Sequence, residues 1–149
     1  MFIIQFIASF IGVVAFAINI EIPKKYICIV GGVGAIGWLT YLVCIKFNLP
    51  NILAYFLSAL LVTIISMILS KTLKAISTIF LIPGILPIVP GAAMYEMIYS
   101  LINNNIQDAK YYLFQAILIA GGIALAIFIT GSIKDVEIIR KEKINEDKI

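Results

Sequence analysis

The chain has 149 residues, of which 62% are hydrophobic and only 13% are charged, and its mean hydropathy is +1.10. These values lie far outside the range of soluble globular domains and indicate an integral membrane protein, with little chain left for a soluble domain. The formal net charge of +3 does not indicate nucleic-acid binding, because the basic residues are scattered at span ends or mixed with acids near the C-terminus.

The composition also argues against metal and enzyme chemistry. The chain has no histidine, which removes the commonest general base and metal ligand. Cys28 and Cys44 fall in one apolar segment, where helix geometry separates them by roughly 24 Å, so they cannot form a disulfide with each other. We interpret both as small buried hydrophobic residues, and we expect no catalytic residue, no metal and no cofactor.

Four segments are predicted to cross the membrane as helices: residues 2–20, 26–45, 52–69 and 111–129. The connectors EIPKK (21–25), FNLPN (47–51) and NNNIQDAK (103–110) separate them. The first segment also resembles a signal peptide cleaved after Ala17, but nothing positive precedes it and the apolar run continues to residue 20. The membrane domain is predicted at 1–133, followed by a charged tail at 134–149 that extends the last helix and pairs Glu137 with Lys141.

A fifth apolar segment, residues 79–102, either crosses the membrane as a broken helix or enters and leaves on one side. The positions of Lys and Arg favour crossing. With the N-terminus outside, only Lys46 and Lys110 lie outside, whereas a re-entrant segment leaves five basic residues outside and six inside. In the crossing arrangement, nine basic residues lie inside: Lys24, Lys25, Lys71, Lys74, Lys134, Arg140, Lys141, Lys143 and Lys148. The sequence therefore predicts an all-α polytopic bundle of about five transmembrane helices, the fourth discontinuous, with the N-terminus out and the C-terminus in.

Polar and small residues share faces of the predicted helices. A stripe in the first span consists of Gln5, Ser9, Gly12, Phe16 and Asn19, and the third span has a polar side made of Tyr55, Ser58, Thr63, Ser66 and Ser70. Small residues recur every four positions at Gly31 and Ala35 in the second span and at Ala116, Ala120 and Ala124 in the last. Such rows predict close helix packing, either within the subunit or between subunits.

The stretch IFLIPGILPIVPGAAMYEM, residues 79–97, contains three prolines in an apolar run. Non-helical backbone at membrane depth is tolerated where protein buries it or where it lines a water-filled cavity. A helix that restarts near Gly91 directs its N–H groups and positive dipole end at the break, which suits a carboxylate. The other interpretation, a kinked helix without a ligand, accounts for one proline better than for three.

The half-helix after the last proline has two different sides. Tyr95, Glu96, Tyr99, Ser100 and Asn103 occupy one arc of roughly 140°, and the apolar residues occupy the other. Glu96 is the only acid well inside an apolar segment, and an intramembrane carboxylate is costly unless it is neutral, paired or facing a cavity. We expect Glu96 to contact a proton or the substrate; the alternative is that it lies near the interface and reaches water unaided.

The run IPGILPIVPGAAMY, residues 82–95, resembles the proline-glycine signature IPGxxPLVPGxxxY of the threonine/serine exporter family. The stretch INIEIPKKYICIVGGVGAIGWLTY, residues 18–41, is similar to that family's pattern between its first two spans. The likeness covers nearly the whole chain except the tail. By matching position the resemblance implies that substrate is bound by Pro83, Gly84, Pro87, Pro90, Gly91 and Tyr95, to which the polar arc adds Glu96 and Tyr99.

The chain resembles the short, membrane-only second half of the split form of that family, so the resemblance implies a larger membrane partner subunit. It also implies proton-driven export of threonine, serine or dicarboxylates across the bacterial plasma membrane. Ala75, Ile88 and Glu96 depart from the family's pattern, and Glu96 bears on charge preference and coupling. A homo-oligomer, and in particular a self-assembling channel or holin-like pore, is the alternative from another class.

Overall fold

The structure is a computed structural model that describes the backbone of residues 2–146 and the side chains of residues 2–132. Every element in this part of the chain is a helix, as the sequence predicts. In chain order they are α1 (Phe2–Asn19), α2 (Lys24–Lys46), α3 (Asn51–Leu73), α4 (Thr78–Ile85), the 3₁₀ turn η1 (Leu86–Ile88), α5 (Gly91–Ile102) and α6 (Ile106–Glu146).

Four of these helices are long and apolar enough to cross a membrane: α1, α2, α3 and residues Ile106–Ser132 of α6. The segments Thr78–Ile88 and Gly91–Ile102 together form a fifth apolar unit, which is bent by 47° at its break. The prediction of an all-α polytopic bundle with a discontinuous fourth span is therefore confirmed. The division between a membrane domain at 1–133 and a tail at 134–149 stays a prediction, although α6 continues unbroken across it to Glu146.

Helix ends differ from the predicted connectors by a few residues. The polar run at 103–110 is not a loop throughout, because α6 already begins at Ile106. Asn105 starts this helix as a cap: its Oδ1 accepts a hydrogen bond from the Asp108 N–H (3.3 Å), and its Nδ2 donates to Asp108 Oδ2 (2.6 Å). The predicted pair of Glu137 and Lys141 lies outside the described side chains.

Four helices end in the same way, with one residue in the left-handed conformation. These residues are Glu21, Asn48, Lys74 and Asn104, with φ between 48° and 58°, and none of them is glycine. In each case the N–H of the following residue bonds the carbonyl five positions back, for example Ala75 to Ser70 (3.1 Å). This is the Schellman arrangement, which satisfies carbonyls that the helix leaves open and reverses the chain sharply.

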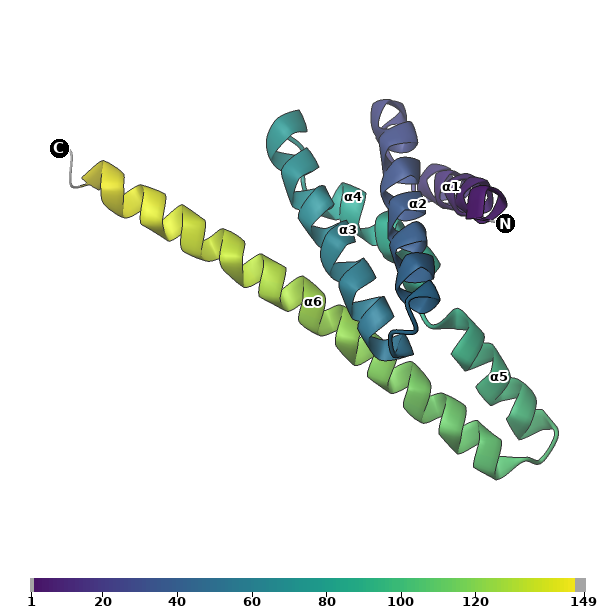
Figure 1. The fold of residues 1–149 in the computed structure, drawn as a ribbon. Helices are drawn as coiled ribbons and strands as arrows, with labels where there is room; N and C mark the ends of the chain where they lie inside the picture. The colour runs from purple at the N-terminus through teal and green to yellow at the C-terminus, as the bar shows by residue number, and fades with distance from the viewer. Residues whose placement is uncertain (1, 147–149) are drawn as a thin grey trace.

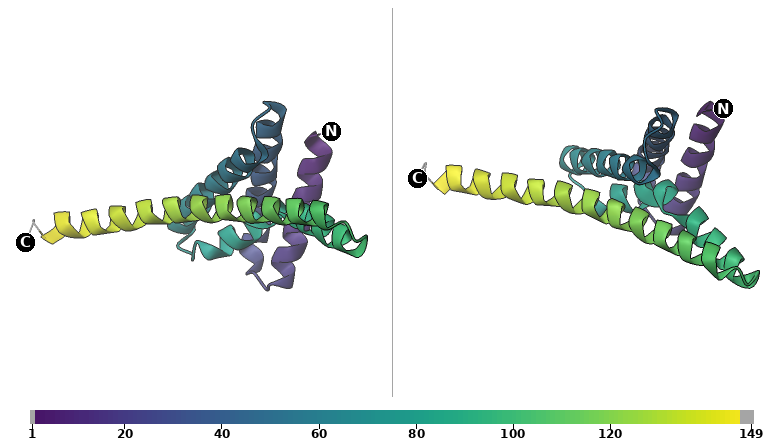
Figure 2. Two further views of the ribbon diagram at one scale, coloured as in Figure 1. Left: turned by 90° about the horizontal axis from the view of Figure 1, so that it is seen from below. Right: turned by 60° about the horizontal axis from the view of Figure 1, so that its bottom comes forward.

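The broken unit is inserted into the bundle by its first half only. Helix α4 and η1 lie against α1, α2 and α3, whereas α5 leaves this group and lies against α6 alone among the described elements. Helix α6 crosses α3 obliquely, and its C-terminal part extends beyond the other helices (Figure 1). Figure 2 shows the same extension of α6 from two other directions.

Two apolar clusters hold the helices together. One joins α2, α3, α4, η1 and α6 and is centred on Val33, Val62 and Ile88, with Ile119 and Ile123 contributed by α6. The other joins α1, α2 and α4, where the rings of Tyr26 and Phe80 meet edge to face at 5.3 Å between centroids.

The small residues of α2 pack within the subunit. A Cβ atom added to Gly31 would lie 2.6 Å from Val14 of α1, and one added to Gly34 would lie 2.6 Å from Val13. Helices α1 and α2 therefore approach too closely for a side chain at either glycine. The row in α6 is different, because Ala116 is buried whereas Ala120 and Ala124 are exposed. The subunit-interface interpretation therefore remains only for the α6 row.

Candidate functional site

The break in the fifth apolar unit lies between η1 and α5, at Val89 and Pro90. Val89 is extended (φ −56°, ψ 138°), as expected for a residue before proline, and Pro90 has φ −73° and ψ 48°. Pro83, by contrast, lies inside α4. Pro87 is the second residue of η1 and follows Leu86, whose backbone is still helical (φ −46°, ψ −46°). Only the third proline therefore ends the helical conformation, and the first two shape the turn that leads to it.

The N-terminal side of the break is buried in the bundle. Pro83, Gly84, Ile88 and Pro90 are buried, whereas Pro87 is half-buried. A Cβ atom at Gly84 would lie 2.9 Å from Val33 Cγ1 and 3.1 Å from a methyl group of α3. This glycine therefore permits α4 to approach both α2 and α3 closely. The described residues leave no open space beside it.

The contact between α2 and α3, against which η1 packs, includes a hydrogen bond. The buried Ser58 hydroxyl donates a hydrogen bond to the Gly37 carbonyl (2.5 Å), and a Cβ atom at Gly37 would lie 3.2 Å from Ile88 of η1. Sequence reasoning found Ser58 as part of the polar side of α3 but did not connect it with Gly37. The glycine-rich run at residues 31–37 was the available signal, because it predicts close packing of α2 against a neighbouring helix.

The other polar residues of α3 also point into the bundle. The Thr63 hydroxyl donates to the Ala59 carbonyl (2.7 Å), and the Ser70 hydroxyl donates to the Ala75 carbonyl (2.5 Å). The Ser66 hydroxyl is fully buried and has no hydrogen-bond partner among the described residues. The predicted polar side of α3 therefore faces protein and serves mainly its own and neighbouring backbone.

The C-terminal side of the break is open. Gly91 and Ala92 are exposed, and a Cβ atom at Gly91 would meet nothing within 4 Å. The Gly91 N–H donates to the Val89 carbonyl (2.7 Å), and helical hydrogen bonding resumes with Met94 to Pro90 (3.1 Å). Between these two, no backbone hydrogen bond from the N–H of Ala92 or Ala93 occurs in the described part of the chain. Two amide donors at the positive end of α5 are thus available to a ligand.

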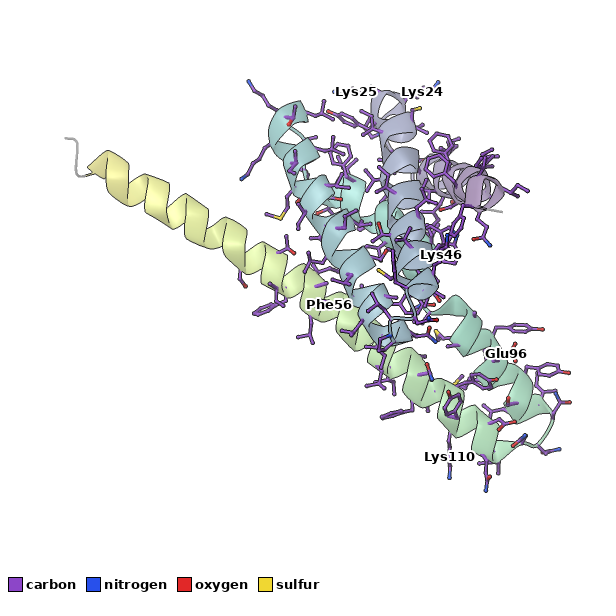
Figure 3. The ribbon with its side chains drawn as sticks, viewed as in Figure 1. Lys24, Lys25, Lys46, Phe56, Glu96 and Lys110 are labelled. Atoms are coloured by element: carbon purple, nitrogen blue, oxygen red, sulfur yellow. The ribbon has the colours of Figure 1, made fainter. Side chains whose placement is uncertain are left out.

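The predicted polar arc of α5 is divided between two environments. Tyr95 and Tyr99 are 65% and 55% exposed, and their rings stack with centroids 6.3 Å apart. Ser100 is buried on the side of the helix that packs against α6, and Glu96 is half-buried between these two faces (Figure 3). No ion pair joins Glu96 to another described side chain. The structure thus brings Gly91, Tyr95 and Tyr99 onto the open side of the break and leaves Pro83 and Gly84 inside the bundle.

The described residues contain no cluster of three or more His, Cys, Asp or Glu side chains that could hold a metal ion. Cys28 is exposed and Cys44 is buried, so only one of the two fits the interpretation as a buried hydrophobic residue. Burial was predicted for Cys28 because its whole segment is apolar. The structure instead leaves it on the outer side of α2.

Comparison with known proteins identifies a family that the chain resembles. A family model described as "Threonine/Serine exporter, ThrE" matches residues 5–133. No curated protein and no solved structure matches the chain. The matched region includes α1 from residue 5 onward, the whole of α2 to α5 and the apolar part of α6, so it contains both sides of the break.

Proposed function

Because the chain belongs to the threonine/serine exporter family, whose model covers residues 5–133, we propose that it is one subunit of a secondary exporter of small carboxylate-bearing metabolites. Membership in the family makes the chain a multi-pass membrane protein of an exporter family rather than an enzyme family. The substrates of this proposal are threonine, serine or similar amino acids, or dicarboxylates. The observation that carries it is the open break before α5, with two amide donors that lack a backbone partner.

The substrate carboxylate binds at the N-terminus of α5 in this proposal. The N–H groups of Ala92 and Ala93 donate to the carboxylate oxygens, and the positive end of the helix dipole favours the negative charge. Gly91 keeps the approach open, because it carries no side chain at the point where the carboxylate enters. Tyr95 and Tyr99 line the same exposed side with an apolar ring surface and a hydroxyl each.

The remaining residues of the predicted site hold the break in its shape. Pro83 and Gly84 fix α4 against α2 and α3, and Pro87 and Pro90 turn the chain so that α5 starts at an angle to α4. Proline is suited to this task because it lacks a backbone N–H and fixes φ, and glycine is suited because it needs no side-chain space. Their contribution to binding is thus through the position of the α5 amides.

A larger membrane partner subunit is the second part of the proposal. Amide groups that lack partners are costly in hydrocarbon, so the start of α5 needs water, substrate or protein around it. The described chain covers α5 with α6 only, and the outer sides of both helices carry large exposed apolar residues. These include Tyr95, Ile98, Ile102, Phe114, Ile117 and Phe128. In this proposal, a partner that packs there encloses the break and completes the pathway.

Proton coupling through Glu96 is the third part. The carboxyl is half-buried, has no ionic partner among the described side chains, and lies one turn after Ala92 and Ala93 on the same helix. An ionisable residue within a membrane-spanning segment is by default a functional candidate, so Glu96 is the residue of α5 to which we assign the proton. In this mechanism protonation of Glu96 and carboxylate binding at the α5 N-terminus alternate during the transport cycle.

For the location we propose the bacterial plasma membrane, with the N-terminus out and the C-terminus in. Lys24 and Lys25 lie at one end of α2, and Lys46 lies at its other end (Figure 3). Lys71 and Lys74 lie at the end of α3, so the antiparallel return of α3 brings them to the same side as Lys24. The more basic side faces the cytoplasm under the positive-inside rule.

Export assays with and without the partner gene test the proposed function. Cells that express this chain together with a neighbouring gene for a larger membrane protein are loaded with labelled threonine, serine or succinate, and efflux is followed. We expect efflux only when both proteins are present, and we expect it to be lost with Gly91→Leu in a chain that still inserts. Ion conductance by the purified chain alone in liposomes would instead favour the channel alternative.

A further inference from the structure

A second concave feature lies away from the break, between the ends of α1 and α2. It is an open groove of about 810 Å³, a size typical of ligand sites. Its main lining residues are Phe10, Val14 and Ile18 from α1, Glu21 from the turn, and Lys24 and Cys28 from α2.

The groove is lined mainly by apolar side chains. Phe10 and Val14 fill the space over Gly31, where a Cβ atom would lie 2.8 Å and 2.6 Å from their side chains. From Phe10 to Ile18 the α1 side of the groove rises about 12 Å along the helix. The groove therefore runs from the end of α2 into the hydrocarbon layer. Its shape and lining suit a hydrocarbon chain that lies along α1.

Two opposite charges stand at the mouth of the groove. Glu21 and Lys24 both line it and are both exposed, and neither forms an ion pair or a side-chain hydrogen bond with another described residue. Among the described side chains, the other charged groups at this end of the bundle are Lys25, whose ammonium lies 4.6 Å from the Tyr26 ring centroid, and Lys71 and Lys74 at the end of α3. None of these three lines the groove. The mouth itself therefore offers one hydrogen-bond acceptor with negative charge and one donor with positive charge.

We propose that this groove is a binding site for phosphatidylethanolamine, with one acyl chain between α1 and α2 and the headgroup between Glu21 and Lys24. The Lys24 ammonium donates to a phosphate oxygen, and the primary ammonium of the lipid donates to the Glu21 carboxylate. The charge pattern of the mouth selects this headgroup. Phosphatidylcholine has the same charges but no N–H donor, and phosphatidylglycerol has no positive group for Glu21.

The site is tested by quenching of tryptophan fluorescence with brominated phospholipids in vesicles that contain the full chain. The reporter is Ile18→Trp in a Trp38→Phe background, because Ile18 lies at the groove and is 59% exposed. The unchanged chain provides the control reporter, since Trp38 lies about 21 Å along α2 from Lys24. Brominated phosphatidylethanolamine, phosphatidylcholine and phosphatidylglycerol are each compared at the same mole fraction in unbrominated phosphatidylcholine.

We expect phosphatidylethanolamine to bind at the Ile18→Trp reporter about fivefold more tightly than either other lipid, as one charge-assisted contact would give, and to show no preference at Trp38. Glu21→Gln should abolish the preference over phosphatidylcholine, and Lys24→Gln should weaken binding of all three lipids. Lys74→Asn is the matched control at the same end of the bundle, and it should change neither quantity.

Three results would overturn the proposal. The first is equal quenching by all three lipids at the groove reporter, and the second is a phosphatidylethanolamine preference that survives Glu21→Gln. The third is a groove reporter that no brominated lipid quenches, because protein, either a second copy or a partner helix, then fills the groove. None of these results depends on export, so the lipid site and the proposed transport function fail separately.

Discussion

The two glycines of the proline-glycine signature should respond in opposite ways to the same substitution. In Gly84→Ala the new Cβ atom lies 2.9 Å from Val33 Cγ1 and 3.1 Å from Val62 Cγ1, well inside the ordinary carbon–carbon contact distance of about 3.5–4.0 Å. Valine side chains are restricted at χ1, so the helices must move apart, and such overpacking costs about 1–3 kcal/mol.

In Gly91→Ala the new atom meets nothing within 4 Å, and the backbone of Gly91 does not have a positive φ. Alanine is a better helix former than glycine by up to about 1 kcal/mol, so this change should be neutral or slightly stabilising. The two variants have the same chemistry and lie on the two sides of the break. A comparison of the two variants therefore tests whether Gly84 is enclosed by packed side chains and whether Gly91 faces open space.

Thermal unfolding of the purified proteins in one detergent measures the difference. Gly84→Ala should lower Tm by about 3–10 °C relative to the unchanged protein, and Gly91→Ala should not lower it. Gly91→Leu provides the functional comparison, because it should retain Tm while it removes export. A loss of stability in Gly91→Ala as large as that in Gly84→Ala would refute the assignment of an open space before α5.

Three further predictions concern single residues: Glu96, Ser58 and Lys74. Glu96→Gln should flatten the pH dependence of export without a loss of insertion, and an unchanged pH profile measured in proteoliposomes would remove Glu96 from the coupling mechanism. Ser58→Ala should lower the free energy of unfolding by about 1 kcal/mol, because it removes the hydrogen bond to the Gly37 carbonyl. Thr72→Ala is the control and should have a smaller effect, because the exposed Thr72 hydroxyl bonds a carbonyl of its own helix. Lys74→Gly should stabilise the protein by about 1 kcal/mol, since glycine adopts the left-handed conformation without strain, and it should do so more than Asn104→Gly in the same unfolding assay.

The spans could be predicted because long apolar runs bounded by prolines, lysines and asparagines leave few alternatives. The start of α6 was missed because Gln107 and Asp108 are polar, yet they occupy a first turn that the Asn105 cap stabilises. Hydropathy detects membrane depth, and it does not detect a helix that continues into the polar layer. The Schellman ends were also beyond sequence reasoning, because no glycine marks any of the four left-handed residues.

The sequence predicts which residues form the candidate site better than it predicts how they are arranged in space. The prolines located the segment, but their sequence does not say that Pro90 alone ends the helical conformation or that Gly84 is enclosed by two valines. That difference depends on which helices pack against α4, and such tertiary contacts are not encoded in the spacing of one segment. Likewise, the helical wheel grouped Ser100 with Tyr95 and Tyr99, whereas the packing of α6 covers only the serine.

Substrate protection of a cysteine at the start of α5 measures whether a carboxylate binds beside the α5 amides. Ala92→Cys is introduced into a chain in which Cys28 and Cys44 are changed to serine, and the protein is expressed with its partner and treated with a membrane-impermeant thiol reagent. We expect the cysteine at this position to react, and we expect threonine, serine or succinate to slow the reaction whereas choline, which lacks a carboxylate, does not. A position 92 that reacts equally with and without every carboxylate, or that never reacts, would contradict this expectation.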